Sequence, residues 1–376
     1  MRETTQTVAE GLEGVVAART RISDVDGEAG RLTIAGFALE EIAGRATAEE
    51  MIWLLWRDAL PTAPERDAFA RDLAERRALP SIALDLLRAA AARQSDPMDA
   101  LRMAAATLSL DAPADDEDQA RTVIARFPVI AAAYERLSQG HEPIAPRPDL
   151  GHAANYLYCL TGAPASPERV RALETYWNAV ADHGLNASTF TARVIAATGS
   201  DLVSAVTGAV GALKGPLHGG APGPALDMVF EIGSPERAEP ILREKLERGE
   251  RMMGFGHRIY KVRDPRADVL ASAAERLFQS DGDRALYRIA LEVEQTVLRL
   301  LEEYKPGRRL QTNVEFYTAL LLHGLGMPTR LFTPTFAAGR AAGWLAHCFE
   351  QRRTGRIIRP QSEYVGERGR TYPSQE

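Results

Sequence analysis

The most regular feature of the sequence is the recurrence of apolar residues every three or four positions over most of the chain. This spacing puts them on one face of a helix, so the sequence predicts an all-α protein. The best strand candidate is the segment 31–34 (RLTI) near the start. The clearest predicted helices cover residues 81–94, 97–110, 117–138 with a kink at Pro128, 166–182 and 285–304.

Several predicted helix boundaries are marked by residues that prefer those positions. The triplets SPE at Ser166 and NAS at Asn186 each put a side-chain oxygen before a helical run, where it can accept a hydrogen bond from a free backbone N–H. Gly140, Gly199 and Gly307 follow shortly after predicted helices, and glycine is common at that point because it adopts positive φ. These signals predict where the helices begin and end.

Small residues and proline-rich breaks predict the larger organisation. The runs 186–199 and 202–213 are rich in alanine, glycine, threonine and valine, so we expect two buried central helices that approach closely. Residues 143–148 (PIAPRP) form one predicted connection, and 219–224 (GGAPGP) form a second with a hinge-like composition. The second is the predicted domain boundary. Irregular element lengths argue against a helical solenoid.

The composition describes a globular chain with a large core. Of 376 residues, 45% are apolar and 26% are charged, and the length suggests about two domains. A formal charge of −6 gives no basic footprint for nucleic acid. Two cysteines, Cys159 and Cys348, are too few for a disulfide framework, which suggests a reducing compartment. With neither an N-terminal apolar signal core nor a run of about 18 apolar residues, we expect a cytoplasmic protein without membrane contact.

Candidate chemistry is concentrated in the second half of the chain. His218 in KGPLHGG and His257 in MGFGHR stand beside glycines, where an imidazole can meet a ligand without neighbouring side chains in the way. The same stretch holds a possible base and several possible anion-binding groups, namely Glu315, Arg266, Arg340 and Arg359. Acids, bases and guanidinium groups together favour carbon-acid chemistry on an anionic substrate.

Other interpretations of these residues are weaker. We interpret the histidines outside glycine-rich motifs as structural, namely His141, His152, His323 and His347. Neither glycine-rich segment has dinucleotide or P-loop spacing after a clear strand. We expect no metal, since the sequence shows neither an HExxH-like pair of histidines nor a cluster of thiolates.

Four ordered motifs resemble the citrate synthase family, which includes the 2-methylcitrate synthases: GPLHGG at 215–220, residues 253–266, NVEFY at 313–317 and residues 336–347. The resemblance runs from GLEGV at 11–15 to Arg359-Pro360. It implies a mostly α-helical, two-domain homodimer of the tricarboxylic acid cycle, whose mobile small domain closes over oxaloacetate and then admits acetyl-CoA. The small domain would be residues 220–327, between large-domain parts 1–219 and 328–376.

The resemblance also implies roles for the candidate residues. Glu315 would remove a methyl proton from acetyl-CoA, His218 would donate a hydrogen bond to the thioester oxygen, and His257 would polarise and protonate the ketone of oxaloacetate. Citryl thioester hydrolysis would then release citrate and CoA, with no tightly bound cofactor. His183, Arg266, Arg340 and Arg359 would bind oxaloacetate. Arg359 would come from the other subunit. Lys261 and Arg263 are candidates for the CoA phosphates.

Three departures from the common family pattern leave the substrate open. Glu315 stands where aspartate is usual, Val180 and Gly184 replace a histidine and an acid beside His183, and Pro222-Gly223 replaces the usual Asn-Glu. One methyl group separates acetyl-CoA from propionyl-CoA, which is worth only about 1–3 kcal/mol of discrimination in an apolar pocket. A 2-methylcitrate synthase is therefore an alternative. Another is a regulatory homologue that binds CoA and oxaloacetate with little turnover.

Overall fold

The chain folds mainly into helices, in agreement with the all-α prediction. The computed structural model describes residues 8–110, 112, 115–219, 222–281 and 283–372, and 61% of the chain is helical. The α-helices within these residues are α1 (Leu39–Ile42), α2 (Ala48–Arg57), α3 (Ala63–Glu75), α4 (Ser81–Ala92), α5 (Pro97–Thr107), α6 (Asp116–Ser138), α7 (His152–Thr161), α8 (Pro167–Val180), α9 (Ala187–Ala196), α10 (Leu202–Leu213), α11 (Pro222–Ile232), α12 (Ala238–Glu247), α13 (Pro265–Asp281), α14 (Arg284–Tyr304), α15 (Val314–Gly324) and α16 (Phe332–Thr354).

Local sequence signals act where they were expected. Strand β2 (Arg31–Ile34) is the predicted strand, and it lies between β1 (Ser23–Asp26) and β3 (Phe37–Ala38) in an antiparallel sheet. Ser166 and Asn186 cap α8 and α9 by accepting from backbone N–H groups. The three glycines predicted to follow helices all have positive φ: Gly140, Gly199 and Gly307.

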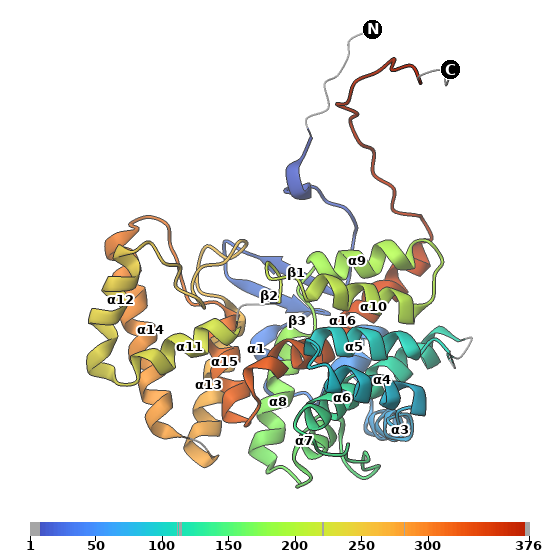
Figure 1. Cartoon of the computed structure of the whole chain (residues 1–376), viewed down its shortest axis with the longest axis horizontal. Helices are drawn as coiled ribbons and strands as arrows, with labels where there is room; N and C mark the ends of the chain where they lie inside the picture. The colour runs from blue at the N-terminus through green and yellow to red at the C-terminus, as the bar shows by residue number, and fades with distance from the viewer. Residues whose placement is uncertain (1–7, 111, 113–114, 220–221, 282, 373–376) are drawn as a thin grey trace.

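Helix α16 runs through the middle of the molecule and packs against α2, α6, α8, α9 and α10 (Figure 1). The prediction that 202–213 forms a buried helix is confirmed by α10, which contacts α5, α9 and α16. Helix α9 packs against α10 and α16. The expected close approach of α9 and α10 is confirmed, because a Cβ at Gly208 of α10 would lie 2.3 Å from Ile195 Cδ1 of α9.

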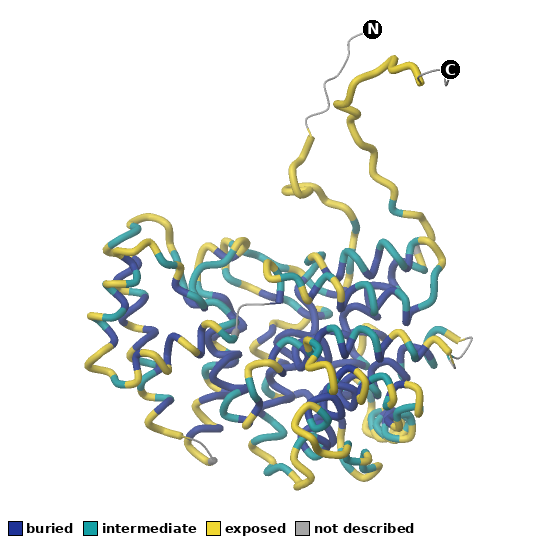
Figure 2. Tube along the Cα trace, in the orientation of Figure 1, coloured by how far each residue is buried: buried dark blue, intermediate teal, exposed yellow. Residues whose placement is uncertain are grey.

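Helices α11 to α15, yellow to orange in Figure 1, gather at one side of the molecule. They meet the rest of the chain where α13 and α15 pack on α8. The expected boundary at 219–224 falls here, although Gly220 and Ala221 lie outside the described residues. The described segments 8–19 and 356–372 leave the body of the molecule and are mostly exposed (Figure 2). Among the described residues, no helix is long and apolar enough to cross a membrane.

Candidate active site

Two loops that carry predicted site residues are hydrogen-bonded to each other. Gly256 N donates to Gln311 O (2.7 Å), Asn313 N donates to Gly254 O (2.9 Å), and Asn313 Nδ2 donates to Gly256 O (2.7 Å). Gly254 has φ +88°, and a Cβ there would lie 2.9 Å from Phe316 Cβ, so this close pairing requires glycine. The pairing fixes the loop of His257 against the first turn of α15, which carries Glu315.

His257 presents a neutral imidazole with a defined proton. Its Nδ1 accepts from the backbone N–H groups of Ile259 and Tyr260, both at 3.1 Å, so the ring proton of the neutral form lies on Nε2. Burial lowers the pKa of His257 to about 4, with help from the charge of Arg266. Arg266 Nη2 lies 3.4 Å from Nε2 but can only donate, so it does not accept the ring proton. The Nε2–H group therefore remains available to a ligand.

Arg266 is a buried cation held by a neighbouring carboxylate. Asp264 accepts from Arg266 Nε (3.0 Å) and Nη2 (2.8 Å), and its second oxygen also accepts from Val314 N (3.2 Å). Burial opposes the charge, but Asp264 raises the pKa of Arg266 above its ordinary value. Asp264 was not among the predicted site residues, although it stands two positions before Arg266. It orients the guanidinium and ties it to the start of α15.

Arg340 contributes a second buried cation from the middle of α16. Its Nε donates to the carbonyl of Val180, while its terminal nitrogens have no hydrogen-bond partner within the described part of the chain. Burial lowers the pKa of Arg340 to about 10, and Asp182 acts in the opposite direction. A guanidinium with free terminal donors in a buried place is suited to a carboxylate ligand.

His183 brings the α8–α9 loop to the same place. Its Nε2 lies 3.1 Å from Tyr260 Oη, and its ring centre is 5.7 Å from that of His257. Burial lowers the pKa of His183 well below its usual range, and both Arg266 and Arg340 contribute. His183 is therefore neutral and next to the two cations.

His218 lies after α10, with its proton position set by Ser188. The backbone N–H of Ser188 points at Nε2 (3.3 Å) and can only donate, which leaves the proton of the neutral ring on Nδ1. Ser188 Oγ also contacts Nε2 (2.8 Å) and accepts from Trp344 Nε1 (3.0 Å). Burial lowers the pKa of His218 to about 4, with a smaller contribution from the charge of Arg340. Ser188 was missed by the sequence analysis, which attended only to the helix cap at Asn186.

Glu315 is the second residue of α15 and is half-buried. Among the described residues its carboxylate accepts no hydrogen bond, but its charge acts on Arg266, Arg340 and Tyr176. Burial raises the pKa of Glu315 to about 7, while Arg266 works against this rise. The carboxyl group thus lies within electrostatic range of the two cations, and its raised pKa makes it a stronger base than an exposed glutamate.

The other predicted residues are placed differently. Arg359 is exposed in the extended segment beyond α16. Lys261 is exposed, with its ammonium 3.4 Å from Arg258 O. Arg263 forms ion pairs with Asp268 and Glu294, and its contact with a CoA phosphate stays a prediction. No cluster of metal-ligating side chains occurs in the described part of the chain.

Comparison with known proteins gives consistent matches over nearly the whole chain. The family model described as "Citrate synthase, C-terminal domain" matches residues 11–361. The citrate synthase of Haloferax volcanii is 42% identical, over 95% of this chain and 96% of its own. Citrate synthase 2 of Bacillus subtilis is also 42% identical, over 96% of each chain.

Solved structures agree with this match. Citrate synthase from Pyrobaculum aerophilum has a TM-score of 0.89 at 36% identity, covering 100% of this chain and 96% of its own. The enzyme from Thermoplasma acidophilum, solved as a ternary complex with carboxymethyl coenzyme A and oxaloacetate, also has a TM-score of 0.89, at 30% identity and covering 98% of this chain and 99% of its own.

Proposed function

Since this chain belongs to the citrate synthase family, we propose that it condenses a short acyl-CoA, acetyl-CoA first, with oxaloacetate to give citrate and CoA. The observation that carries the proposal is the grouping of two buried guanidinium groups, neutral imidazoles and one carboxyl group of raised pKa. Such a site can bind a dianion and remove a proton from carbon nearby.

Oxaloacetate is the proposed ligand of the two buried cations. Arg266 and the free terminal nitrogens of Arg340 can each meet a carboxylate, and His183 lies beside both. His257 Nε2–H would then donate to the ketone oxygen. This N–H stabilises the negative charge as the ketone becomes an alkoxide and supplies the proton of the alkoxide, and water then returns a proton to the ring.

Acyl-CoA is proposed to react through its enol. The Glu315 carboxylate takes a proton from the carbon next to the thioester carbonyl, which contributes about 100- to 10,000-fold to the rate. His218 Nδ1–H donates to the thioester oxygen as negative charge builds up there. The enol carbon then bonds to the ketone carbon of oxaloacetate, the alkoxide receives a proton from His257, and water cleaves the citryl thioester to citrate and CoA.

The remaining assignments are proposals of the same kind. Residues 220–327 form the small domain, and Lys261 contacts a CoA phosphate. The protein is a cytoplasmic homodimer of the tricarboxylic acid cycle, and Arg359 completes the partner's site. In support, both cysteines are reduced and buried, and Arg359 extends away from the body of its own chain.

Release of free thiol from acetyl-CoA and from propionyl-CoA, each with oxaloacetate, tests this function. We expect release with acetyl-CoA and citrate as the product. A higher kcat/KM with propionyl-CoA, with 2-methylcitrate as product, would instead support the alternative synthase. Tight oxaloacetate binding without thiol release from either thioester would reject an enzyme and favour a regulatory homologue.

A further inference from the structure

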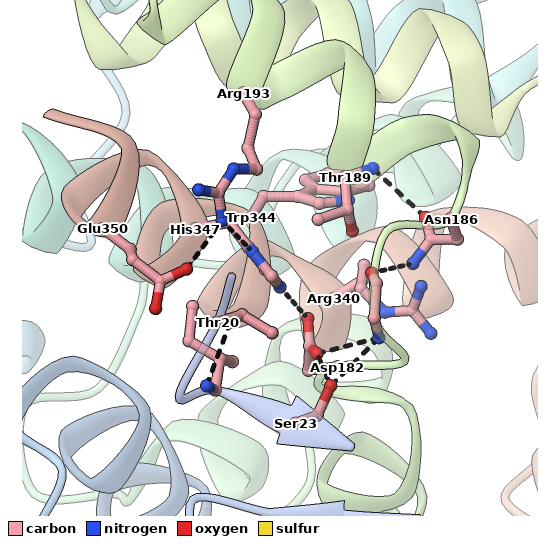
Figure 3. A network of polar contacts seen from close by, with 12 residues as sticks. Thr20, Ser23, Asp182, Asn186, Thr189, Arg193, Arg340, Trp344, His347 and Glu350 are labelled. Carbon is pink, nitrogen blue, oxygen red and sulfur yellow. Dashed lines mark hydrogen bonds and ion pairs between the residues drawn. The ribbon is translucent and has the colours of Figure 1, made fainter. Parts of the chain in front are cut away.

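A network of buried polar side chains extends from His183's loop to the far side of α16 (Figure 3). Asp182 and His347 have no exposed side-chain surface, and His347 Nε2 lies 3.1 Å from Asp182 Oδ1. Neither atom has another polar partner among the described residues. His347 Nδ1 faces Arg193 Nη1 at 2.9 Å. None of these three residues contacts the reacting atoms of the proposed chemistry.

The partners of His347 decide where its proton lies. Arg193 can only donate, so His347 Nδ1 accepts and the ring proton lies on Nε2, facing Asp182. Arg193 is held in turn by Glu350 (2.7 Å) and by Gln351 Oε1 (3.1 Å). Arg193 therefore donates to His347, and His347 donates to Asp182.

Asp182 connects this network to the proposed oxaloacetate site. Its Oδ2 accepts from Ser23 Oγ and from Gly184 N (3.1 Å), which closes the turn around His183. Its charge also acts on Arg340. Burial opposes this charge, but His347, Ser23 and Arg340 keep the pKa of Asp182 below its ordinary value. A buried carboxylate is stable only with such partners. If Asp182 loses one of them, its side chain and the groups bound to it can shift.

We propose that His347 is a positioning residue that acts through Asp182 to hold the His183 turn and Arg340 in place for oxaloacetate. This inference rests on the proposed function. It goes beyond the interpretation of His347 as structural: at metal sites, groups that support a ligating side chain commonly change affinity or activity about 10- to 100-fold when removed.

Two similar substitutions separate this role from simple packing. In His347→Gln the amide nitrogen is as many bonds from Cα as Nε2 and can still donate to Asp182. In His347→Asn the amide is as many bonds from Cα as Nδ1, so it can face Arg193 but falls short of Asp182. His152→Leu is the control, because His152 is also fully buried in the large-domain part and contacts neither Asp182 nor Arg193.

The measurements are the Kd of oxaloacetate by calorimetry, KM for both substrates and kcat. We expect His347→Asn to raise the oxaloacetate Kd and KM about tenfold, with kcat at saturation and the acyl-CoA KM nearly unchanged. His347→Gln should stay within about twofold of wild type, and His152→Leu should change thermal stability alone. Equal values for the Asn and Gln variants would overturn the proposal.

If His347→Asn does not fold, Ser23→Ala carries the test, because it removes the hydroxyl on the other oxygen of Asp182. It should raise the oxaloacetate Kd about tenfold, at the lower end of the range for supporting groups, and an unchanged Kd would reject the inference. Absence of thiol release in the wild type would reject the proposed function instead, while binding of oxaloacetate still reports on His347.

Discussion

At the scale of single residues, the chemistry depends most on Glu315. Its carboxyl group is half-buried at the start of α15 and has a pKa raised to about 7 by burial. A base with a pKa near the working pH combines a useful fraction of the ionised form with a strong tendency to take a proton. The extra methylene relative to aspartate moves the base, so the precise position of α15 matters.

Substitution of Glu315 should separate catalysis from binding. Glu315→Gln removes the base but keeps the size, so we expect kcat to fall at least about 100-fold and the oxaloacetate Kd to change less than about twofold. Glu315→Asp should also lose about 100-fold, because the base retreats by about 1 Å. Steady-state kinetics measures kcat, and calorimetry measures the oxaloacetate Kd. A Glu315→Gln variant with nearly normal kcat would exclude Glu315 as the base.

The raised pKa predicts the pH dependence. Because the ionised form is the base, kcat/KM for acyl-CoA should fall about tenfold for each pH unit below about 7 and level off above it. The folded state holds this proton more tightly than the unfolded chain, whose ordinary value is 4.5, so stability is lost as pH rises from 4.5 through about 7. Glu315→Gln should therefore have the higher Tm above neutral pH. A kcat/KM that stays level far below neutral pH would contradict this.

The sequence identified the principal candidate residues but not their supporting partners. His218 and His257 stand out because of their glycines, and Glu315 because of its motif. Asp182 and His347 are 165 positions apart, and no local periodicity relates them. Ser188 and Trp344 are likewise distant in sequence and meet only through packing of α9 on α16.

At the scale of elements, the pairing of the 254–257 loop with 311–314 sets the distance between acid and base. Asn313 joins them in two ways: its Oδ1 caps α15 by accepting from Glu315 N (3.0 Å), and its Nδ2 donates to Gly256 O (2.7 Å). A change in this one side chain should therefore affect the positions of both His257 and Glu315.

Asn313→Asp keeps the helix cap and loses the second contact. Aspartate caps helices as well as asparagine does, so Tm should fall less for Asn313→Asp than for Asn313→Ala. Because a shift of about 1 Å at the reacting groups can cost about 100-fold, we expect kcat to fall at least about tenfold. Thermal unfolding and kinetics of Asn313→Asp beside Asn313→Ala, which loses both contacts, check this. Equal kcat for Asn313→Asp and wild type would show that the loop pairing does not set the geometry.

Elements with a strong local signal were predicted well. Helix α10 and strand β2 have the predicted bounds, and α8 and α9 begin after the predicted caps. The pairing of the 254–257 loop with 311–314 depends on neighbours far along the chain, so the local pattern could not predict it.

At the scale of the whole molecule, Arg359 stands apart from the other predicted oxaloacetate-binding residues. The C-terminal segment leaves the body after α16 and carries the exposed Arg359, while the buried cations Arg266 and Arg340 lie within the fold. In the proposed homodimer, this arginine would complete the site of the other subunit.

Mixed dimers test that arrangement. Arg359→Ala and Glu315→Gln should each be nearly inactive alone, but a heterodimer holds one site with both native groups. After unfolding and refolding together in equal amounts, half of the dimers are mixed, so about one quarter of the wild-type activity should return. Arg340→Ala mixed with Glu315→Gln provides a matched pair. Because Arg340 and Glu315 act within one chain, no site of that mixed dimer has both native groups, and the Arg340 mixture should stay nearly inactive. If Arg359 also acted within its own chain, the Arg359 mixture would stay equally inactive.

The central claim is that Glu315 and His218 converge on the acyl group while Arg266 and Arg340 hold oxaloacetate. A crystal structure of the protein with oxaloacetate and carboxymethyl-CoA tests it most directly, since the two carboxylate oxygens of this analogue take the places of the enol oxygen and the enol carbon. We predict a Glu315 carboxyl oxygen within about 3 Å of one of these oxygens and His218 Nδ1 within about 3 Å of the other. A Glu315 side chain directed away from the bound analogue would contradict the account.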